Sequence, residues 1–373
     1  MKVLHVITGL DVGGAELQLD AVLQHTRNDA DVVTLYNPGP VADKLREHGV
    51  RVRDLGMRRN TELGALLRLY RIIRDGRYDV VHAHLYRAQV YARPAARLAR
   101  TPVIVTTEHS IGETHIERRK MTTGVRALYL ASELTSDATI AVAEVVRDRL
   151  VRWGVPARKI TVIPNGLDFS SLGFNPAARS AVREQFGISP DAFVIGTLGR
   201  LDPNKRIDLA IEACARLRRK LVVIGSGQDE SRLRQMARPE TCFLGWRSDE
   251  EIRDHLRRCR ALIFPGEEDF GIVPVESMAC STPVIALGKG GAAETVVPHR
   301  AGDDATGVWF DEQTPECLAE AILEFESHAD DFDPSALRRQ ALRFSAATYR
   351  ERLFAALDAV LEGRDPARGR LAA

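Results

Sequence analysis

Two glutamates eight residues apart form the most chemically distinctive segment of this 373-residue chain. The segment, Phe264–Cys280, places Glu268 in an acidic loop and Glu276 in or near the first turn of a helix that we expect to begin close to Pro274. A carboxylate accepts hydrogen bonds from neighbouring hydroxyls in pairs, so two carboxylates beside loop amides would suit a sugar nucleotide. Alternatively, Glu276 could simply be a favourable negative charge at the positive end of the helix dipole. The three consecutive acids at 267–269, however, are more than a helix cap needs.

Two cations follow another expected strand. Arg200 comes directly after Gly199, and Lys205 follows five residues later. A guanidinium binds two oxygens at once and an ammonium acts as a movable point charge, so this pair would suit a diphosphate. Two solvated surface charges are the alternative interpretation, and the spacing alone leaves it open.

A glycine-rich loop with Gly13 and Gly14 separates the first expected strand from a helix. Glycines let the backbone approach a ligand closely, and a helix N-terminus offers unpaired N–H groups to an anion. The loop matches neither the dinucleotide-binding fingerprint nor the P-loop. A tight turn without a ligand therefore remains an equal alternative.

Histidines stand at the ends of two further expected strands. His82 and His84 alternate and therefore share one face of their strand, and His109 closes another strand. Such a pair could hold a metal, but no cysteine or carboxylate stands at a convincing third-ligand spacing. We therefore expect no metal.

Repeated strand–helix units must position these residues. Short apolar runs separated by segments of helical period predict parallel sheets covered on both faces. The expected strands of the first half are Lys2–Thr8, Asp31–Tyr36, Val50–Leu55, Asp79–Ala83, Pro102–Thr107 and Ile160–Ile163. Those of the second half are Phe193–Leu198, Leu221–Ile224, Cys242–Leu244, Ala261–Phe264 and Pro283–Ala286. The main expected helices are Ala15–His25, Thr61–Arg74, Ala88–Arg100, Val142–Trp153 and Ala346–Leu361.

The alternation restarts after the turn signal Pro164-Asn165-Gly166, which predicts two doubly wound α/β domains. We expect residues 1–168 to form the first domain and residues 169–345 the second. Residues 346–373 should form a helix and tail that pack back on the first domain. Such sheets bind ligands beyond the carboxyl ends of their strands, so two facing sheets would enclose a central cleft.

Composition excludes several classes of protein. Apolar residues make up 45% and charged residues 28% of the chain, as in globular proteins, and the net charge of +1 gives no nucleic-acid footprint. Five cysteines without a CxxC pair favour a reduced, cytoplasmic chain. Residues 1–165 carry 25 basic and 18 acidic side chains, and they include Arg118-Arg119-Lys120. A solvated basic face explains this excess, and peripheral contact with the inner face of a membrane is the alternative.

These segments together resemble family-4 glycosyltransferases, a retaining group with the two-domain GT-B fold, over nearly the whole chain. The most specific element is the E-x7-E motif from Glu268 to Glu276, which continues in the style of the family through Val296. The other segments that match in order and spacing are Gly13–Glu16, Pro164–Asp168 and Gly199–Lys205.

The resemblance implies a nucleotide-diphosphate sugar as donor, held mainly by the second domain. Arg200 and Lys205 would hold the diphosphate, Glu276 the ribose hydroxyls and Glu268 the transferred sugar. The other implied sugar contacts are the backbone amides of Phe270, Gly271 and Ile272. Because the leaving diphosphate gains negative charge, cations aimed at it would stabilise the transition state.

The first domain would bind the acceptor, which is a glycan, a lipid-linked saccharide or a small molecule. Its Gly13-Gly14 loop would close over the phosphate, and His109 would touch the sugar. No metal and no other cofactor are implied. Ser110 stands where an acidic residue frequently follows the histidine, and Asp269 replaces a frequent glycine.

Two other functions remain open within the same fold. A hydrolysing nucleotide-sugar 2-epimerase would need acid and base groups beside the donor. A non-catalytic nucleotide-sugar-binding subunit would bind the donor without transfer. The sequence identifies neither the base, the sugar nor the acceptor, and a UDP- or GDP-linked hexose is the expected donor.

Overall fold

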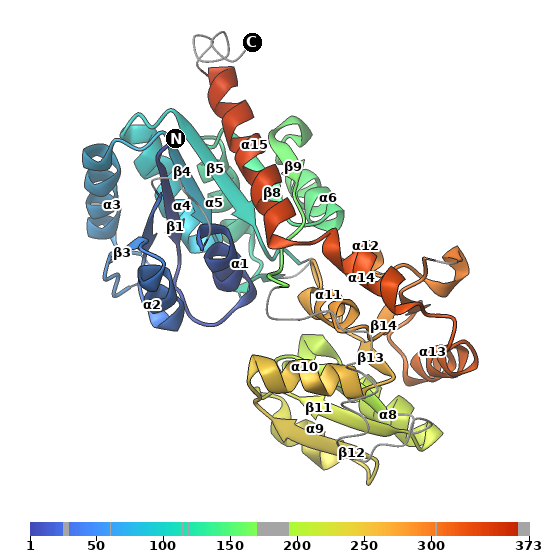
Figure 1. Ribbon diagram of the computed structural model, residues 1–373. Helices are drawn as coiled ribbons and strands as arrows, with labels where there is room; N and C mark the ends of the chain where they lie inside the picture. Colours follow the sequence, from blue (N-terminus) through green and yellow to red (C-terminus); the bar gives the residue numbers. More distant parts are fainter. Residues whose placement is uncertain are drawn as a thin grey trace. The chain divides into compact units, whose positions relative to one another are not determined.

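The computed structural model describes residues 1–24, 30–59, 61–112, 115–117, 119–169, 194–302 and 304–364 (Figure 1). The chain forms two compact units. The first unit comprises Met1–Gly166 together with Ala346–Ala373, and the second comprises Leu167–Ser345. The chain therefore leaves the first unit and returns to it through its C-terminal helix.

The first unit is built on a seven-stranded parallel sheet with the order β3-β2-β1-β4-β5-β8-β9. Its strands are Val3–Ile7 (β1), Ala30–Thr34 (β2), Arg51–Asp54 (β3), Val80–His84 (β4), Val103–Glu108 (β5), Ala138–Ala141 (β8) and Ile160–Val162 (β9). A separate antiparallel hairpin pairs His115–Ile116 (β6) with Arg119–Lys120 (β7). The helices are Gly14–Leu23 (α1), Gly39–Glu47 (α2), Leu63–Gly76 (α3), Tyr86–Leu98 (α4), Thr123–Glu133 (α5), Glu144–Trp153 (α6), the 3-10 turn Ala157–Lys159 (η1) and Ala346–Arg364 (α15).

Helices cover both faces of this sheet because successive side chains on a buried strand point to opposite faces. On β1, Val3 and Ile7 join a core shared with α1, α2 and α15. Leu4 and Val6 point the other way, into a core shared with α3 and α4. The α15 side chains in the first core repeat every fourth residue and form one stripe: Tyr349, Leu353, Leu357 and Leu361.

The second unit is built on a six-stranded parallel sheet with the order β12-β11-β10-β13-β14-β15. Its strands are Val194–Leu198 (β10), Lys220–Ile224 (β11), Thr241–Gly245 (β12), Ala261–Phe264 (β13), Val284–Leu287 (β14) and Gly307–Phe310 (β15). Its helices are Ile207–Leu217 (α8), Glu230–Met236 (α9), Asp249–Arg258 (α10), Ile272–Ala279 (α11), Ala292–Thr295 (α12), Pro315–Ser327 (α13) and Pro334–Leu342 (α14). Two 3-10 turns, Pro203–Lys205 (η2) and His299–Ala301 (η3), complete it.

Both sheets share one plan, in which the chain starts in the middle, moves to one edge, then returns and continues to the other edge. The strand order therefore reverses between β1 and β4 in the first unit and between β10 and β13 in the second. Ligands of such sheets bind beyond the carboxyl ends of the strands at this reversal. Two doubly wound α/β units of this kind are the architecture that the sequence predicts.

The structure corrects the expected start of one helix and adds elements. Helix α11 begins at Ile272, two residues before Pro274, because Gly271 forms the N-cap in a left-handed conformation with φ +83°. Pro274 fits inside the first turn, where its missing N–H has no partner to lose. The sequence analysis did not identify α2, α5, β8 and β15 individually. Each strand among them has four residues, which is too short to show a clear period.

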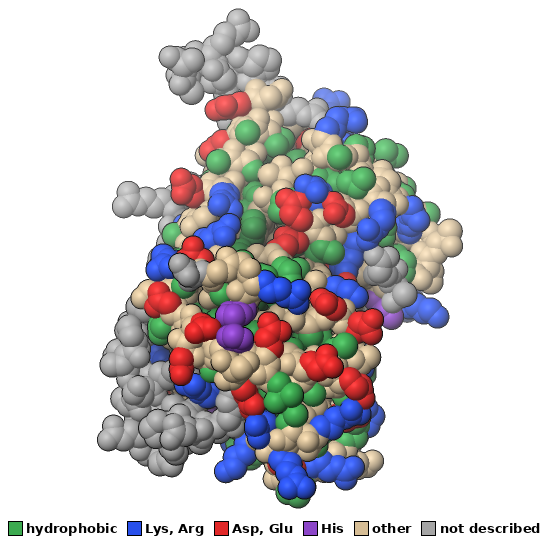
Figure 2. All heavy atoms as spheres, turned by 90° about the vertical axis from the view of Figure 1, so that its right-hand side faces the viewer, with side chains coloured by type: hydrophobic (Ala, Val, Ile, Leu, Met, Phe, Trp, Pro, Cys, Tyr) green, Lys and Arg blue, Asp and Glu red, His purple; other side chains and the backbone are tan. Residues whose placement is uncertain are grey.

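Charges of both signs alternate over the surface shown in Figure 2, where Lys and Arg side chains lie among Asp and Glu. This mixture agrees with the near-zero net charge. No helix in the described ranges combines the length and the apolar character needed to cross a bilayer. Arg118 of the basic triplet lies outside the described residues, and the exposed Lys120 ends β7.

Candidate functional site

The loops that follow β10 and β11 are in direct backbone contact. A Cβ atom on Gly225 would lie 1.9 Å from the carbonyl oxygen of Gly199, so only glycine fits at position 225. Gly199 itself has φ +142°, a conformation that side chains disfavour. This contact fixes the turn that carries Arg200 at the carboxyl end of β10.

Lys205 and Glu268 meet across the reversal point of the second sheet. Lys205 ends η2 after β10, Glu268 lies in the loop after β13, and Nζ of the lysine forms an ion pair with Oε1 of the glutamate. Both side chains are about one-fifth exposed (19% and 22%), so solvent screens the pair only in part. The acidic loop rests on η2, because a Cβ on Gly266 would lie 2.8 Å from the carbonyl oxygen of Asn204.

Arg200 lies at the same edge but is more open to solvent. Its side chain is 55% exposed, and its Nε lies 3.6 Å from Oδ2 of Asp202. An exposed guanidinium with so loose a partner remains available to an anion. Lys205, by contrast, must break its ion pair with Glu268 before it can bind a phosphate.

The backbone from Glu268 to Ile272 is fixed by a second glycine turn. The N–H of Gly291 donates to the carbonyl of Glu268 at 2.7 Å. A Cβ on Gly291 would lie only 2.3 Å from Cα of Phe270, so this close approach requires glycine. Within the part of the chain that the structure describes, no side chain forms a cap hydrogen bond at the start of α11. The amides at the start of α11 are therefore held in place by packing, as a preorganised anion or hydroxyl contact requires.

Glu276 lies in the second turn of α11 and is partly buried. Burial, together with the negative charge of Asp249 on α10, raises the pKa of Glu276 to about 7. A carboxyl group in this state gains from any ligand that donates hydrogen bonds to its ionised form. The vicinal hydroxyls of a ribose are such donors.

The glycine-rich loop of the first unit leads directly into α1. Gly13 is the N-cap of this helix in an extended conformation, and Gly14 is its first residue. A Cβ on Gly13 would lie 2.5 Å from Oε2 of Glu16, so the carboxylate of Glu16 folds back towards the cap. An anionic ligand at this helix end would have to displace that carboxylate.

His109 belongs to a cluster of four histidines that lie on β1 and β4 and directly after β5. The four, called the histidine cluster below, are His5, His82, His84 and His109. His109 follows β5, and its Nε2 lies 3.2 Å from Nδ1 of His84. Burial lowers the pKa of His109 to about 4, so its ring is neutral at pH 7.

The structure thus places the predicted residues in two groups. Arg200, Lys205 and Glu268 share the carboxyl edge of β10 and β13, and Glu276 stands on the helix that follows. Gly13, Gly14 and His109 belong to the first unit. Below, the group Arg200, Lys205, Glu268 and Glu276 is called the charged edge.

Sequence reasoning missed His5. This residue is the cross-strand partner of His82, although 77 residues separate the two in the chain. A lone histidine inside the apolar run Val3–Ile7 gives a signal only once β1 and β4 are known to be neighbours. The strand order of the doubly wound sheet supplies that knowledge.

Two parallel doubly wound sheets, each with its own strand reversal, define a two-unit α/β protein of GT-B architecture. The profile described as "Glycosyl transferases group 1" matches residues 178–341, and the profile "Glycosyltransferase Family 4" matches residues 12–171. The chain belongs to glycosyltransferase family 4.

Curated relatives carry related names. A "D-inositol 3-phosphate glycosyltransferase" of Stackebrandtia nassauensis is 30% identical over 255 residues, which cover 61% of this chain and 56% of the relative. A "GDP-mannose-dependent alpha-mannosyltransferase" of Mycobacterium tuberculosis is 31% identical over 196 residues, covering 52% and 50%. The chain thus matches about half the length of these two relatives.

A solved structure extends the likeness to nearly the whole chain. HepE of Anabaena, solved with UDP, superimposes with a TM-score of 0.83 at 24% identity, covering 96% of this chain and 100% of that one. The same protein has also been solved with UDP-glucose. The superposition shows that the fold is shared.

Proposed function

We propose that this chain is a retaining glycosyltransferase that moves a hexose from a UDP- or GDP-linked donor to an acceptor hydroxyl. The observation that carries the proposal is the charged edge, with two cations and two carboxylates at the strand reversal of the second unit. The names of the two relatives and the UDP-bound state of HepE support a nucleotide-sugar donor.

The proposed reaction develops positive charge on the anomeric carbon and negative charge on the departing diphosphate. Arg200 and Lys205 bind that diphosphate, and their charge is already in place before the bond breaks. Lys205 leaves its ion pair with Glu268 when the donor binds. Glu268 is then free to accept hydrogen bonds from the sugar hydroxyls.

Glu276 and the start of α11 position the rest of the donor. The carboxylate of Glu276 accepts from the ribose hydroxyls, and the amides of Phe270, Gly271 and Ile272 contact the sugar. In the proposed mechanism a diphosphate oxygen takes the proton of the acceptor hydroxyl on the face that the leaving group vacates, which gives retention. No metal ion is needed on the diphosphate, because the two cations supply its countercharge.

The first unit contributes the acceptor side of the proposed reaction. The Gly13-Gly14 loop closes over the phosphate, and His109 contacts the transferred sugar. The acceptor is a glycan, a lipid-linked saccharide or a small molecule, used in the cytoplasm. Sedimentation with anionic lipid vesicles tests peripheral contact at the membrane, because binding to acidic lipid through the basic first half must weaken as salt is added.

The test of the proposal has two steps. A panel of UDP-, GDP-, ADP- and dTDP-sugars is first screened for an increase in melting temperature, since a ligand that binds only the folded state stabilises it. The stabilising donor is then incubated with candidate acceptors, and products are identified by mass spectrometry with the anomeric configuration read by NMR. A free epimerised sugar formed without acceptor would instead show the 2-epimerase, and binding without turnover would show a non-catalytic subunit.

A further inference from the structure

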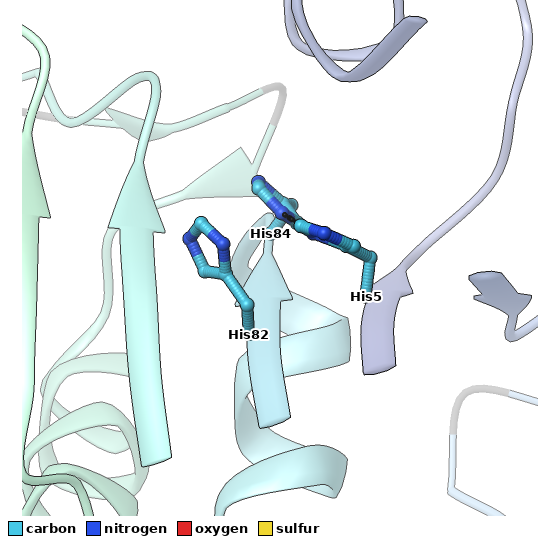
Figure 3. A group of neighbouring side chains, drawn as sticks. All are labelled: His5, His82 and His84. Carbon is cyan, nitrogen blue, oxygen red and sulfur yellow. Dashed lines mark hydrogen bonds between the residues drawn. The ribbon is translucent and has the colours of Figure 1, made fainter. Parts of the chain in front are cut away.

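Three buried histidines from two paired strands converge inside the first unit (Figure 3). His5 lies on β1, and His82 and His84 lie on β4, where the parallel register pairs His5 with His82. One ring nitrogen from each residue can be chosen so that the three lie within 4.8 Å of one another. The side chains are 1%, 0% and 3% exposed, so water competes little for their nitrogens.

One separation between these nitrogens matches that of two ligands of a metal ion. His5 Nδ1 lies 3.2 Å from His84 Nε2. Two imidazole nitrogens bound tetrahedrally to zinc at about 2.0–2.1 Å are about 3.3–3.4 Å apart. Figure 3 shows one ring nitrogen of His82 facing the other two rings. His82 Nδ1 is buried and has no hydrogen-bond partner among the described residues.

The opposite nitrogens of two of these rings already have partners. His82 Nε2 lies 2.7 Å from Oγ1 of Thr107, and His84 Nδ1 lies 3.2 Å from Nε2 of His109. Histidines that bind metals usually donate their second N–H to such an acceptor, which fixes the tautomer and the ring orientation. Thr107 and His109 therefore stand where residues that orient the ligands of a metal site, without binding the metal themselves, would stand.

A network held by hydrogen bonds alone accounts for these contacts less well. The hydrogen bond between His5 Nδ1 and His84 Nε2 pairs only two of the three converging nitrogens. Without a metal, His82 Nδ1 stays buried with no hydrogen-bond partner among the described residues, which is unfavourable.

We propose that His5 Nδ1, His82 Nδ1 and His84 Nε2 bind one divalent transition-metal ion, with Zn²⁺ as the best match. Imidazole suits Zn²⁺, and three histidines with a water or hydroxide in the fourth position make a known zinc arrangement. This site lies in the first unit and is independent of the diphosphate chemistry proposed for the charged edge.

The metal would also determine which ring nitrogen of His109 carries the proton. A metal on His84 Nε2 leaves the His84 proton on Nδ1, from where it is donated to His109 Nε2. His109 then carries its own proton on Nδ1. The proposed ion is thus a positioning element for a residue that the proposed function places beside the sugar.

Metal content tests the proposal in the full chain. The described part of the chain holds a second, more exposed group that could also bind zinc: His299, His328 and Asp331. This group must be disabled by mutation so that it does not contribute to the measured zinc. The reference protein is therefore His299→Asn/His328→Asn, and the test protein adds His82→Asn. Each is stripped with a chelator, incubated with Zn²⁺ alone, desalted and analysed by plasma mass spectrometry.

We expect about one zinc per chain in the reference and less than about a tenth of this in the test protein. Less than about a tenth in the reference, or equal zinc in both, would overturn the proposal. If His82→Asn does not fold by circular dichroism, Co²⁺ in the reference protein decides. Intense visible bands of tetrahedral cobalt with nitrogen ligands support the site, and an octahedral or absent spectrum refutes it.

Discussion

The two units use one sheet topology but place opposite chemistry at the strand reversal. In the second unit, the loops after β10 and β13 bring together Lys205 and Glu268, two partly exposed charges. In the first unit, β1 and β4 bring together buried neutral histidines such as His5 and His82. The position of a site thus follows from strand order, whereas its chemistry follows from the residues that the neighbouring strands and their loops carry there.

The difference also separates the expected roles. Phosphate charge must be met by cations, and Arg200 and Lys205 supply them at the reversal point of the second unit. The neutral rings of the first unit can orient a ligand or bind a metal but cannot neutralise a diphosphate. Mutations in the two groups should therefore change different measured quantities.

The largest effect is expected from Lys205→Ala. Loss of a cation that stabilises the leaving diphosphate should lower kcat about 100-fold or more. Lys220→Ala is the matched control, because this exposed lysine starts β11 at the opposite end of the strands and should leave kcat unchanged. Similar kcat values for the wild type and Lys205→Ala, measured with saturating donor, would contradict the role of the charged edge.

Glu276→Ala should weaken donor binding about ten- to a hundredfold, because charged hydrogen bonds to the ribose are lost. Calorimetric titration of the nucleoside diphosphate measures this change. Glu320→Ala removes an exposed carboxylate from α13 and serves as the control. A 2′-deoxy nucleotide should lose affinity for the wild type but not for Glu276→Ala, and an equal loss for both would place the ribose elsewhere.

Donor affinity should rise with pH through neutrality. Burial, together with the charge of Asp249 on α10, raises the pKa of Glu276 to about 7. Cys280, the C-cap of α11, interacts electrostatically with Glu276. Only the ionised form accepts from both hydroxyls, so affinity at pH 8 should exceed that at pH 6 by up to about tenfold. Glu276→Gln should flatten the profile. An unchanged slope in this variant would assign the titration to another group.

The smallest effect is expected from His109→Ala. Loss of one neutral hydrogen bond to the sugar should lower kcat about three- to tenfold. The affinity for the free nucleoside diphosphate, which carries no sugar, should stay within about twofold of the wild type. A large loss of diphosphate affinity in His109→Ala would contradict the assignment of diphosphate binding to the second unit alone.

Sequence patterns predicted much of this arrangement. The period of the strands and helices predicted two doubly wound sheets. Gly291 meets the need for a close backbone approach, and Gly199 and Gly271 adopt positive φ angles that favour glycine. The ion pair between Lys205 and Glu268 was not predictable, because it depends on how η2 packs under the acidic loop. The raised pKa of Glu276 likewise depends on its burial and on Asp249, which lies on a different helix.

The histidine cluster shows the same limit more clearly. His82 and His84 were visible as an alternating pair, but the pair lacked a third ligand in its own stretch of sequence. His5 reaches them only through the register of β1 with β4. Local spacing can show a site whose ligands share one segment, but it cannot show one assembled across strands.

The most direct test of the charged edge is equilibrium binding of UDP, GDP, ADP and dTDP to the wild type and to Arg200→Ala/Lys205→Ala. We expect at least one nucleotide to bind the wild type at one site per chain, and the double variant to bind it at least about 100-fold more weakly while keeping its fold. Equal affinity in the folded double variant, or no binding of any of the four to the wild type, would contradict the proposed donor site.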